Sequence, residues 1–310
     1  MNKSTPKIYR TTNWSSYNRA LINRGNIAIW FDPATQWYAP SKGKQGRNQT
    51  YSDAAIQCCL MIKSLFRLSL RMVTGFVQSL IHLCGLNWIA PDYTTICRRQ
   101  QHIDIVISYQ KSCDGLYLIV DSTGLKFLGE GEWKRKKHQP EYRRQWRKLH
   151  IGIDAKTLQI RAVQLTTNNV SDSQVLGDLL DQIPQDERVD SVYTDGAYDT
   201  KQCRQVIADR QAHAVIPPRK NAKPWKDKKM GSLERNELLR TVKRLGRTIW
   251  KKWSGYHRRS LVETKMHCIK LLGDKLMARS FPSQVNEIHA RVAVLNRFTE
   301  LGRPLTQVTP

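Results

Sequence analysis

The sequence is short of acidic residues relative to basic ones. Among its 310 residues, 26 are Asp or Glu and 51 are Lys or Arg, which gives a formal net charge of +25. Folding does not require such an imbalance. It indicates a polyanionic partner, because each phosphate neutralised by a basic side chain releases condensed counterions. The alternatives are a soluble basic protein without such a partner and a protein of an anionic membrane surface, although no lipidation signal is visible.

The sequence also lacks the cysteine pattern of a zinc site or a disulfide framework. Its seven cysteines are an odd number and include no C-x-x-C pair, which indicates reduced thiols. No apolar run like that of a signal peptide opens the sequence. The apolar stretch 54–89 is interrupted by Lys63, Arg67 and Arg71, and three charges in one bilayer crossing are costly. We therefore expect a cytoplasmic protein without membrane association.

Residues 1–50 are polar with scattered aromatic side chains, and we expect an arm with short ordered pieces. Beyond this arm the pattern becomes helical. One apolar stripe at helical spacing is formed by Ala55, Cys59, Ile62 and Phe66. Ser52 is a candidate N-cap for this first helix. The stripe predicts that one face of this helix is buried.

Two more helices are predicted, at 71–83 and 91–101, and the second carries Arg98 and Arg99. Three short helices with arginines on the last one are compatible with a helix-turn-helix that binds DNA. They are equally compatible with an ordinary helical bundle that has a solvated basic face. On these residues alone, Arg98 and Arg99 are candidate DNA contacts and no more.

After residue 114 the pattern changes to strands alternating with helices. Strands are predicted at 115–123, at 148–167 as a pair around a turn at 154–157, at 188–199 and at 212–218, and helices at 171–183, about 200–210 and about 257–272. This order is that of a ribonuclease-H-like fold. We therefore predict an α/β protein with a ribonuclease-H-like domain at 114–300, an insertion at about 217–252 before its last helix, a helical DNA-binding region at 51–113 and a tail at 301–310.

One basic segment is interleaved with aromatic residues. Residues 126–148 contain nine Lys or Arg against three Glu, together with Trp146. Such interleaving suits nucleic acid, because bases stack on rings while cations follow the phosphates. Lys134, Arg135 and Trp146 are therefore candidate DNA contacts, and a solvated loop is the alternative.

Two aspartates end predicted strands. Asp121 closes an apolar strand, and Asp195 closes another and is followed by glycine. Carboxylates at the C-terminal edge of such strands lie where ligands bind in α/β folds. Taken singly, each is more simply a turn former.

A third acid lies alone among basic residues in the stretch 256–270. At about 100° per residue, Glu263 shares one helix face with Tyr256, Arg259 and Lys270. The alternative is a solvated charged face. Three carboxylates meeting at the sheet edge would suit Mg²⁺ or Mn²⁺, and two such ions about 4 Å apart support in-line displacement at phosphorus.

Several motifs together identify a family. They are "PDYTTICRR" (91–99), "LIVDSTGLKFLGEGEWK" (118–134), "RKLHIGID" (147–154), "NNVSDS" (168–173), "DGAYDT" (195–200), "IPPRKNA" (216–222) and "YHRRSLVE" (256–263). With them the chain resembles bacterial insertion-sequence transposases of the DDE class, in the insertion-sequence-five family. The resemblance runs from about residue 11 to about residue 297.

The resemblance implies a role for each matching position. Asp121, Asp195 and Glu263 correspond to the catalytic triad that holds two Mg²⁺ (or Mn²⁺) ions. The motif that handles the backbone of the transposon end is matched by Tyr256, Arg259, Glu263 and Lys270. The N-terminal helical region corresponds to the part that recognises terminal inverted repeats. A homodimer on double-stranded DNA and a nucleoid-associated location are expected.

Two other functions remain open from the residues. One is a ribonuclease-H-like nuclease that cuts nucleic acid without joining it. The other is a DNA-binding regulator without catalytic activity. Three converging acids argue against the regulator, because binding alone does not require them.

Overall fold

The computed structural model describes residues 9–41, 43, 48–112, 114–127 and 146–308. The chain divides into two compact units. Unit 1 comprises Met1–Ser108 and Ala293–Pro310, and unit 2 comprises Tyr109–Val292. The arm expected at 1–50 thus belongs to the same unit as the helices that follow it. No helix in the described part of the chain is both long enough and apolar enough to cross a bilayer.

Unit 1 is mainly helical. Its elements are β1 (Tyr9–Thr11), α1 (Trp14–Arg24), the 3-10 turn η1 (Ile27–Ile29), α2 (Asp53–Phe66), α3 (Leu70–Leu83), α4 (Tyr93–Arg99), the last turns of α11 (Phe281–Leu301) and β8 (Thr306–Val308). The strands β1 and β8 pair antiparallel, so the two stretches of sequence that form this unit meet in one small sheet.

The predicted first helix has the expected cap and most of the expected buried face. The Ser52 hydroxyl accepts a hydrogen bond from the Ala55 N–H at 3.0 Å, which satisfies a free donor of the first turn. Buried members of the predicted stripe are Ala55, Cys59 and Ile62. Phe66, at the end of α2, is instead half exposed and packs its ring 5.0 Å from that of Phe76.

Unit 2 is built around one mixed sheet. Its strands are β2 (Leu116–Phe127), β3 (Arg147–Asp154), β4 (Ile160–Thr167), β5 (Val189–Tyr193), β6 (His213–Val215) and β7 (Lys275–Leu276). They lie in the order β4-β3-β2-β5-β6, with β7 paired to the last residues of β2. β2, β3 and β4 run antiparallel, while β2, β5 and β6 run parallel. The central strand β2 thus has the antiparallel strands on one side and the parallel ones on the other.

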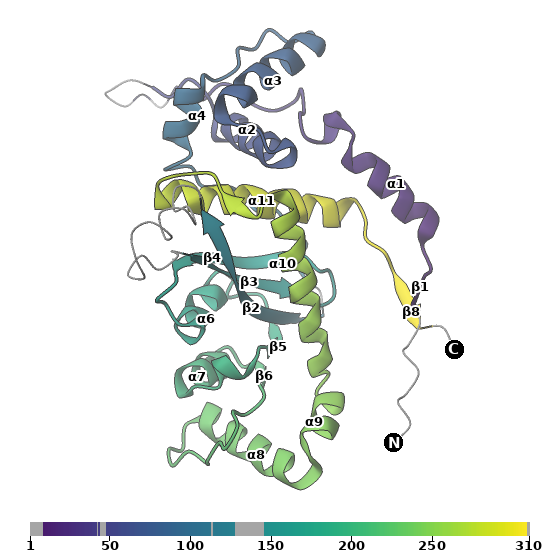
Figure 1. Cartoon of the computed structure of the whole chain (residues 1–310), viewed down its shortest axis with the longest axis vertical. Helices are drawn as coiled ribbons and strands as arrows, with labels where there is room; N and C mark the ends of the chain where they lie inside the picture. Colours follow the sequence, from purple (N-terminus) through teal and green to yellow (C-terminus); the bar gives the residue numbers. More distant parts are fainter. Residues whose placement is uncertain (1–8, 42, 44–47, 113, 128–145, 309–310) are drawn as a thin grey trace, which may run out of the picture. The chain divides into compact units, whose positions relative to one another are not determined.

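Helices cover both faces of this sheet (Figure 1). They are α6 (Asp172–Asp181), α7 (Lys201–Asp209), α10 (Ser260–Leu272) and the first turns of α11, with the 3-10 turns η2 (Gly196–Tyr198) and η3 (Tyr256–Arg259). The helices α8 (Met230–Leu245) and α9 (Arg247–Trp253) lie away from the sheet, where α8 packs against α7. Leu118 and Val120 of β2 share a buried core with α6 and α7. Successive strand residues point to opposite faces, so Asp121 and Thr123 face the other side, where η3 and α10 lie.

The predicted strands and helices of this unit are present, with three differences near the functional residues. The strand predicted to end at Asp121 continues to Phe127, so Asp121 lies inside β2. The strand predicted to stop at Asp195-Gly196 ends slightly earlier, at Tyr193, and in the turn that follows the Asp195 carboxylate accepts from the Ala197 N–H at 2.8 Å. The helix predicted from 257 begins as η3, a 3-10 turn, before it continues as α10. Such turns are frequent at helix ends.

Candidate active site

Asp121 lies on β2 and is the most enclosed of the three acids. Its Oδ1 accepts from the Ser122 N–H at 2.8 Å, and its side chain is 15% exposed. Burial raises the pKa of the Asp121 carboxyl, the Ser122 hydrogen bond and Arg259 act to lower it, and Asp195 and Glu263 raise it again. Asp195 and Glu263 are therefore both near enough to Asp121 to act on its charge.

Asp195 lies in the connection after the neighbouring strand β5. Arg219, from the segment after β6, holds the turn that follows: its Nε donates to Gly196 O at 3.1 Å and its Nη2 to Ala197 O at 2.8 Å. β2 and β5 are parallel neighbours, and their pairing ends at Ile119 and Tyr193. Asp121 and Asp195 each lie two residues beyond this last pair, Asp121 inside β2 and Asp195 in the loop after β5. This topology places Asp121 and Asp195 at the same edge.

Arg259 connects Asp121 with Glu263. Its Nη1 lies 2.5 Å from Asp121 Oδ2, and its Nη2 forms an ion pair with Glu263 Oε1. Partial burial acts to lower the pKa of Arg259, but Asp121, Tyr256 and Glu263 raise it overall. The guanidinium therefore stays charged and neutralises much of the negative charge of this edge.

The carboxylates suit a hard divalent ion by donor chemistry, because Mg²⁺ and Mn²⁺ prefer oxygen ligands. Within the described residues, however, no three His, Cys, Asp or Glu side chains are gathered as a ready-made metal cluster. Arg259 takes up an oxygen of Asp121 and one of Glu263. An ion bound by both acids would have to displace this guanidinium, and the Glu263 side chain, 56% exposed, is free to change rotamer.

Tyr256 and Lys270 frame the same edge. The Tyr256 ring packs 5.7 Å from the ring of Trp250, and burial is the main cause that raises the pKa of its hydroxyl, with Asp195 and Asp121 adding to it. Lys270 Nζ donates to Thr123 Oγ1 at 2.8 Å. The four residues predicted to share one helix face thus all lie toward the end of β2.

A polar cluster lies beneath the other face of β2, and the sequence analysis assigned it no role. Asp172, the first residue of α6, accepts from Ser122 Oγ and from Lys148 Nζ, both at 2.9 Å. His150 Nδ1 lies 3.8 Å from Asp172, and its Nε2 lies 2.9 Å from Thr166 Oγ1. Burial lowers the pKa of His150 to about 4, so its ring is neutral near pH 7. The motif "NNVSDS", which contains Asp172, was the available signal.

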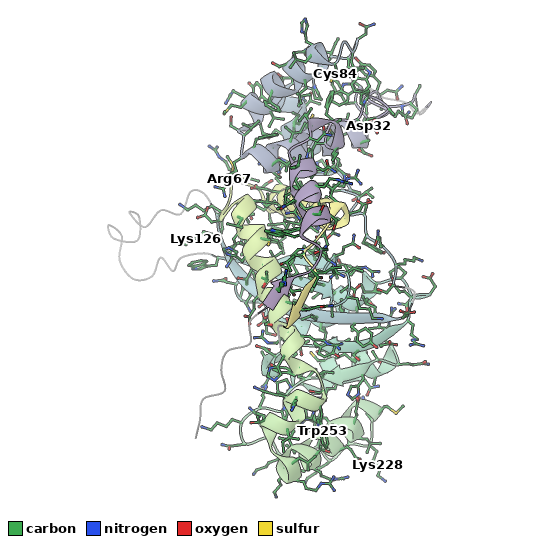
Figure 2. All side chains as sticks on the ribbon, turned by 90° about the vertical axis from the view of Figure 1, so that its right-hand side faces the viewer. Asp32, Arg67, Cys84, Lys126, Lys228 and Trp253 are labelled. Carbon is green, nitrogen blue, oxygen red and sulfur yellow. The ribbon has the colours of Figure 1, made fainter. Side chains whose placement is uncertain are left out.

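The insertion is tied to the turn after Asp195 by a buried ion cluster. Asp199 pairs with Arg204 Nε at 2.9 Å and with Arg235 Nη2 at 3.2 Å, and all three side chains are buried. Arg235 belongs to α8, inside the insertion, and stacks 4.1 Å over the ring of Trp225. Other side chains of this region face solvent: Lys228 of the insertion and Trp253, directly after it, are both exposed (Figure 2).

The remaining candidate DNA contacts differ in their surroundings. Arg98 is exposed, whereas Arg99 forms an ion pair with Asp53 and donates to Tyr51 O at 2.9 Å. The Trp146 ring lies 5.6 Å from Lys126 Nζ, and Lys126 projects from the surface of unit 2 (Figure 2). Lys134 and Arg135 lie outside the described residues. Contact with DNA stays a prediction for all of them.

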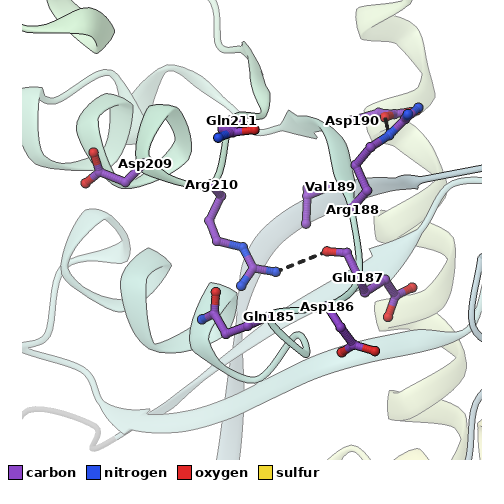
Figure 3. Close-up of a pocket in the computed structure, with 9 residues that line it drawn as sticks. All are labelled: Gln185, Asp186, Glu187, Arg188, Val189, Asp190, Asp209, Arg210 and Gln211. Atoms are coloured by element: carbon purple, nitrogen blue, oxygen red, sulfur yellow. Dashed lines mark hydrogen bonds and ion pairs between the residues drawn. The ribbon is translucent and has the colours of Figure 1, made fainter.

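A surface pocket of about 580 Å³ lies at the opposite edge of the sheet (Figure 3). It is lined by residues 185–190, which lead into β5, and by 209–211, which lead into β6. Several of its charged groups already have partners: Arg188 bonds Asp190 at 2.7 Å, and Arg210 donates to the Glu187 carbonyl oxygen. The pocket contains none of the three acids and adds nothing to their chemistry.

Comparison with protein-family models finds two matches, which together cover most of the chain. Residues 113–297 match a family model described as a transposase DDE domain, and residues 22–130 match a second model with the same description. Among solved structures, a chain is matched in the cryoEM structure of the simian T-cell lymphotropic virus intasome in complex with PP2A regulatory subunit B56 gamma. The match has 15% identity and a TM-score of 0.24, and it covers 70% of this chain and 74% of that one.

Proposed function

Because the chain belongs to the family of transposase DDE domains, we propose that it mobilises an insertion sequence of the insertion-sequence-five family in bacteria. It would bind the terminal inverted repeats, cleave the DNA at the ends of the element and join those ends to target DNA. The excess of basic over acidic residues, 51 against 26, fits the DNA substrate that the family implies.

We propose further that unit 2 is a ribonuclease-H-like domain. The strand order β4-β3-β2-β5-β6 supports this, with three antiparallel strands first and two parallel strands added afterwards. The insertion 217–252 then separates the sheet from the last catalytic helix, α10. In this frame one aspartate lies on β2, the second follows its parallel neighbour β5, and the glutamate comes from the helix α10, which packs against β2.

In the proposed reaction, Asp121, Asp195 and Glu263 would hold two Mg²⁺ or Mn²⁺ ions. When bound, these ions would lower the pKa of the attacking water or hydroxyl and would stabilise the leaving oxygen. Water attacks the phosphorus at the element's end, the bond from phosphorus to the 3′ oxygen breaks, and that oxygen leaves as a hydroxyl. The hydroxyl then attacks a target phosphodiester, and the target's 3′ oxygen leaves in turn.

The basic residues around the acids would position the DNA. When Arg259 leaves the carboxylates, its planar guanidinium can bind a phosphate with two hydrogen bonds. Tyr256 and Lys270 flank the same edge and would contact the backbone of the element's end. Arg98, Arg99, Lys134, Arg135 and Trp146 are proposed as further DNA contacts. Two ends must be paired before joining, so a homodimer would form on DNA, in the nucleoid.

The observation that carries this proposal is the junction of Asp121 and Glu263 at Arg259, next to Asp195. The test is Glu263→Gln, assayed on DNA carrying the chain's own element ends in Mg²⁺. Cleavage should fall by roughly 1,000-fold, because several kcal/mol of charge stabilisation at phosphorus are lost. End binding, measured by gel shift, should stay within about twofold, since a helix-face carboxylate makes no attractive contact with phosphate.

The matched control is Glu237→Gln, which removes an exposed carboxylate from α8 that lies 3.8 Å from Arg240. It should cleave as the wild type does. Normal cleavage by Glu263→Gln would refute the site. A wild type that cuts but does not join a pre-cut end to target DNA would be a nuclease of the same fold. Binding without any cleavage would identify a regulator.

A further inference from the structure

Ser122 joins the two faces of the sheet at the candidate site. Its backbone N–H donates to Asp121 Oδ1 at 2.8 Å, on the face of α10. Its side chain points to the opposite face, where Oγ donates to Asp172 Oδ1 at 2.9 Å. One residue therefore contacts a candidate metal ligand with its backbone and α6 with its hydroxyl.

Asp172 is itself held from several directions. Lys148 Nζ bonds both Asp172 and Val170 O at 2.9 Å, which fixes the ammonium between the strand β3 and the entrance of α6. The capping box of Ser171 and Gln174 fixes the first turn of that helix. Although partial burial acts to raise it, the pKa of Asp172 is lowered overall by the hydrogen bonds from Lys148 and Ser122. The carboxylate is thus ionised and has little freedom to turn.

The cluster differs from the core around it. Beyond Leu118 and Val120, the α6 face of β2 changes from apolar residues to Ser122, and β3 contributes Lys148 and His150 there. Lys148 and Asp172 remain 27% and 24% exposed, and such a partly exposed ion pair contributes about 1 kcal/mol or less to stability. A polar network beside Asp121 therefore calls for an explanation other than stability.

We infer that Asp172 is a positioning residue, which acts through Ser122 to fix the end of β2 and the orientation of the Asp121 carboxylate. The inference rests on the proposed function, because it assigns Asp121 as a metal ligand. Partners that orient a ligand in this way are worth about 10- to 100-fold in metal affinity or activity. Lys148 supports the same arrangement by pairing with Asp172.

The test compares Mn²⁺ affinity and DNA cleavage in Asp172→Ala and Ser122→Ala. Mn²⁺ binding to the isolated protein, followed by electron paramagnetic resonance, should weaken by about 10- to 100-fold in each. The double variant should be no worse than either single one, because both remove the same link. Ser122→Thr keeps the hydroxyl and should recover most of the affinity.

Asp178→Asn is the control, since Asp178 lies on the same helix and accepts from the Gln164 amide at 3.0 Å, away from Ser122. Unfolding in urea is measured on every variant. If Asp172→Ala does not fold, the Mn²⁺ affinity of Ser122→Ala alone tests the positioning role. Lowered stability with unchanged Mn²⁺ affinity would overturn the positioning role. If the wild type binds Mn²⁺ but does not cleave the element's ends, the proposed function is refuted. The comparison of Mn²⁺ affinities among the variants would still test the positioning role.

Discussion

Arg259 is the residue on which the state of the site depends. It pairs with Asp121 and Glu263 at once, and its side chain is 24% exposed against 56% for Glu263. The same guanidinium is proposed to bind phosphate when DNA is present. Acids and phosphate therefore compete for one cation, and DNA that draws Arg259 away would leave two carboxylates ready for metal ions.

This competition predicts that Arg259→Ala binds Mn²⁺ more tightly than the wild type when DNA is absent. Two partly exposed ion pairs of about 0.5–1 kcal/mol each would no longer oppose the ion, so affinity for Mn²⁺ should rise roughly five- to thirtyfold. Calorimetric titration with Mn²⁺ measures it. Arg258→Ala, which removes a neighbouring charge 5.7 Å from the Tyr117 ring, is the control. Equal or weaker Mn²⁺ binding by Arg259→Ala would contradict the competition.

At the residue scale, the sequence was informative where a residue's role depends on its place along the chain. An apolar run precedes both Asp121 and Asp195 in the sequence, although β2 continues past Asp121 to Phe127 while β5 ends before Asp195. The bond of Ser122 to Asp172 joins residues 50 apart, and that of Arg259 to Asp121 joins residues 138 apart. Such pairings depend on how β2, α6 and η3 pack, which a single sequence does not reveal.

Among the elements, α8 has a structural role that its charged composition does not indicate. The insertion is rich in Lys and Arg and was expected to be an interruption of the fold. Its helix α8 instead sends Arg235 into the protein to meet Asp199, and Gly231 lies so close to Arg204 O that an added Cβ would come within 2.5 Å of it. The insertion is thus fixed to the turn that follows Asp195.

Removing the acid of this cluster should destabilise unit 2 strongly. Asp199→Ala leaves two buried guanidinium groups without their carboxylate, and breaking a buried pair costs about 3–5 kcal/mol. Urea unfolding measures the loss. Asp186→Asn, which removes the acid of a solvent-exposed pair with Lys111 at 2.9 Å, should change stability far less. Similar losses in the two variants would show that the cluster does not hold the insertion.

The elements could be predicted where hydrophobic periodicity decides the structure. The buried strand β2 and the amphipathic helix α6 lie within a few residues of the predicted ranges. The helices α8 and α9 were not predicted, because their charged residues mask the apolar spacing. The start of α10 was predicted as α-helix, whereas Gly255, at φ +65°, leads into a 3-10 turn. Local hydrogen bonding decided that detail, and periodicity carries no information about it.

At the scale of the whole molecule, positive charge is spread over both units. The net charge of +25 predicts DNA binding that weakens steeply with salt. Whether a basic side chain contributes to this DNA binding depends on whether it already pairs with another group of the protein. Arg98 and Arg99 adjoin each other on α4. Arg98 is exposed and donates to Thr94 O of its own helix at 3.3 Å, whereas Arg99 is held by Asp53 and the Tyr51 carbonyl at the start of α2.

This difference predicts opposite results for the two arginines. Arg98→Ala should reduce the slope of log K against log salt by about 1 for duplex DNA, with unchanged stability, because one phosphate contact is lost. Arg99→Ala should leave the slope nearly unchanged and lower the free energy of unfolding by about 1 kcal/mol, since its ion pair and hydrogen bond hold α4 to the start of α2. Fluorescence anisotropy at several salt concentrations and urea titration separate these effects. If neither variant alters the slope, α4 does not contact the phosphate backbone through these arginines, and DNA binding by unit 1 must be sought on another helix.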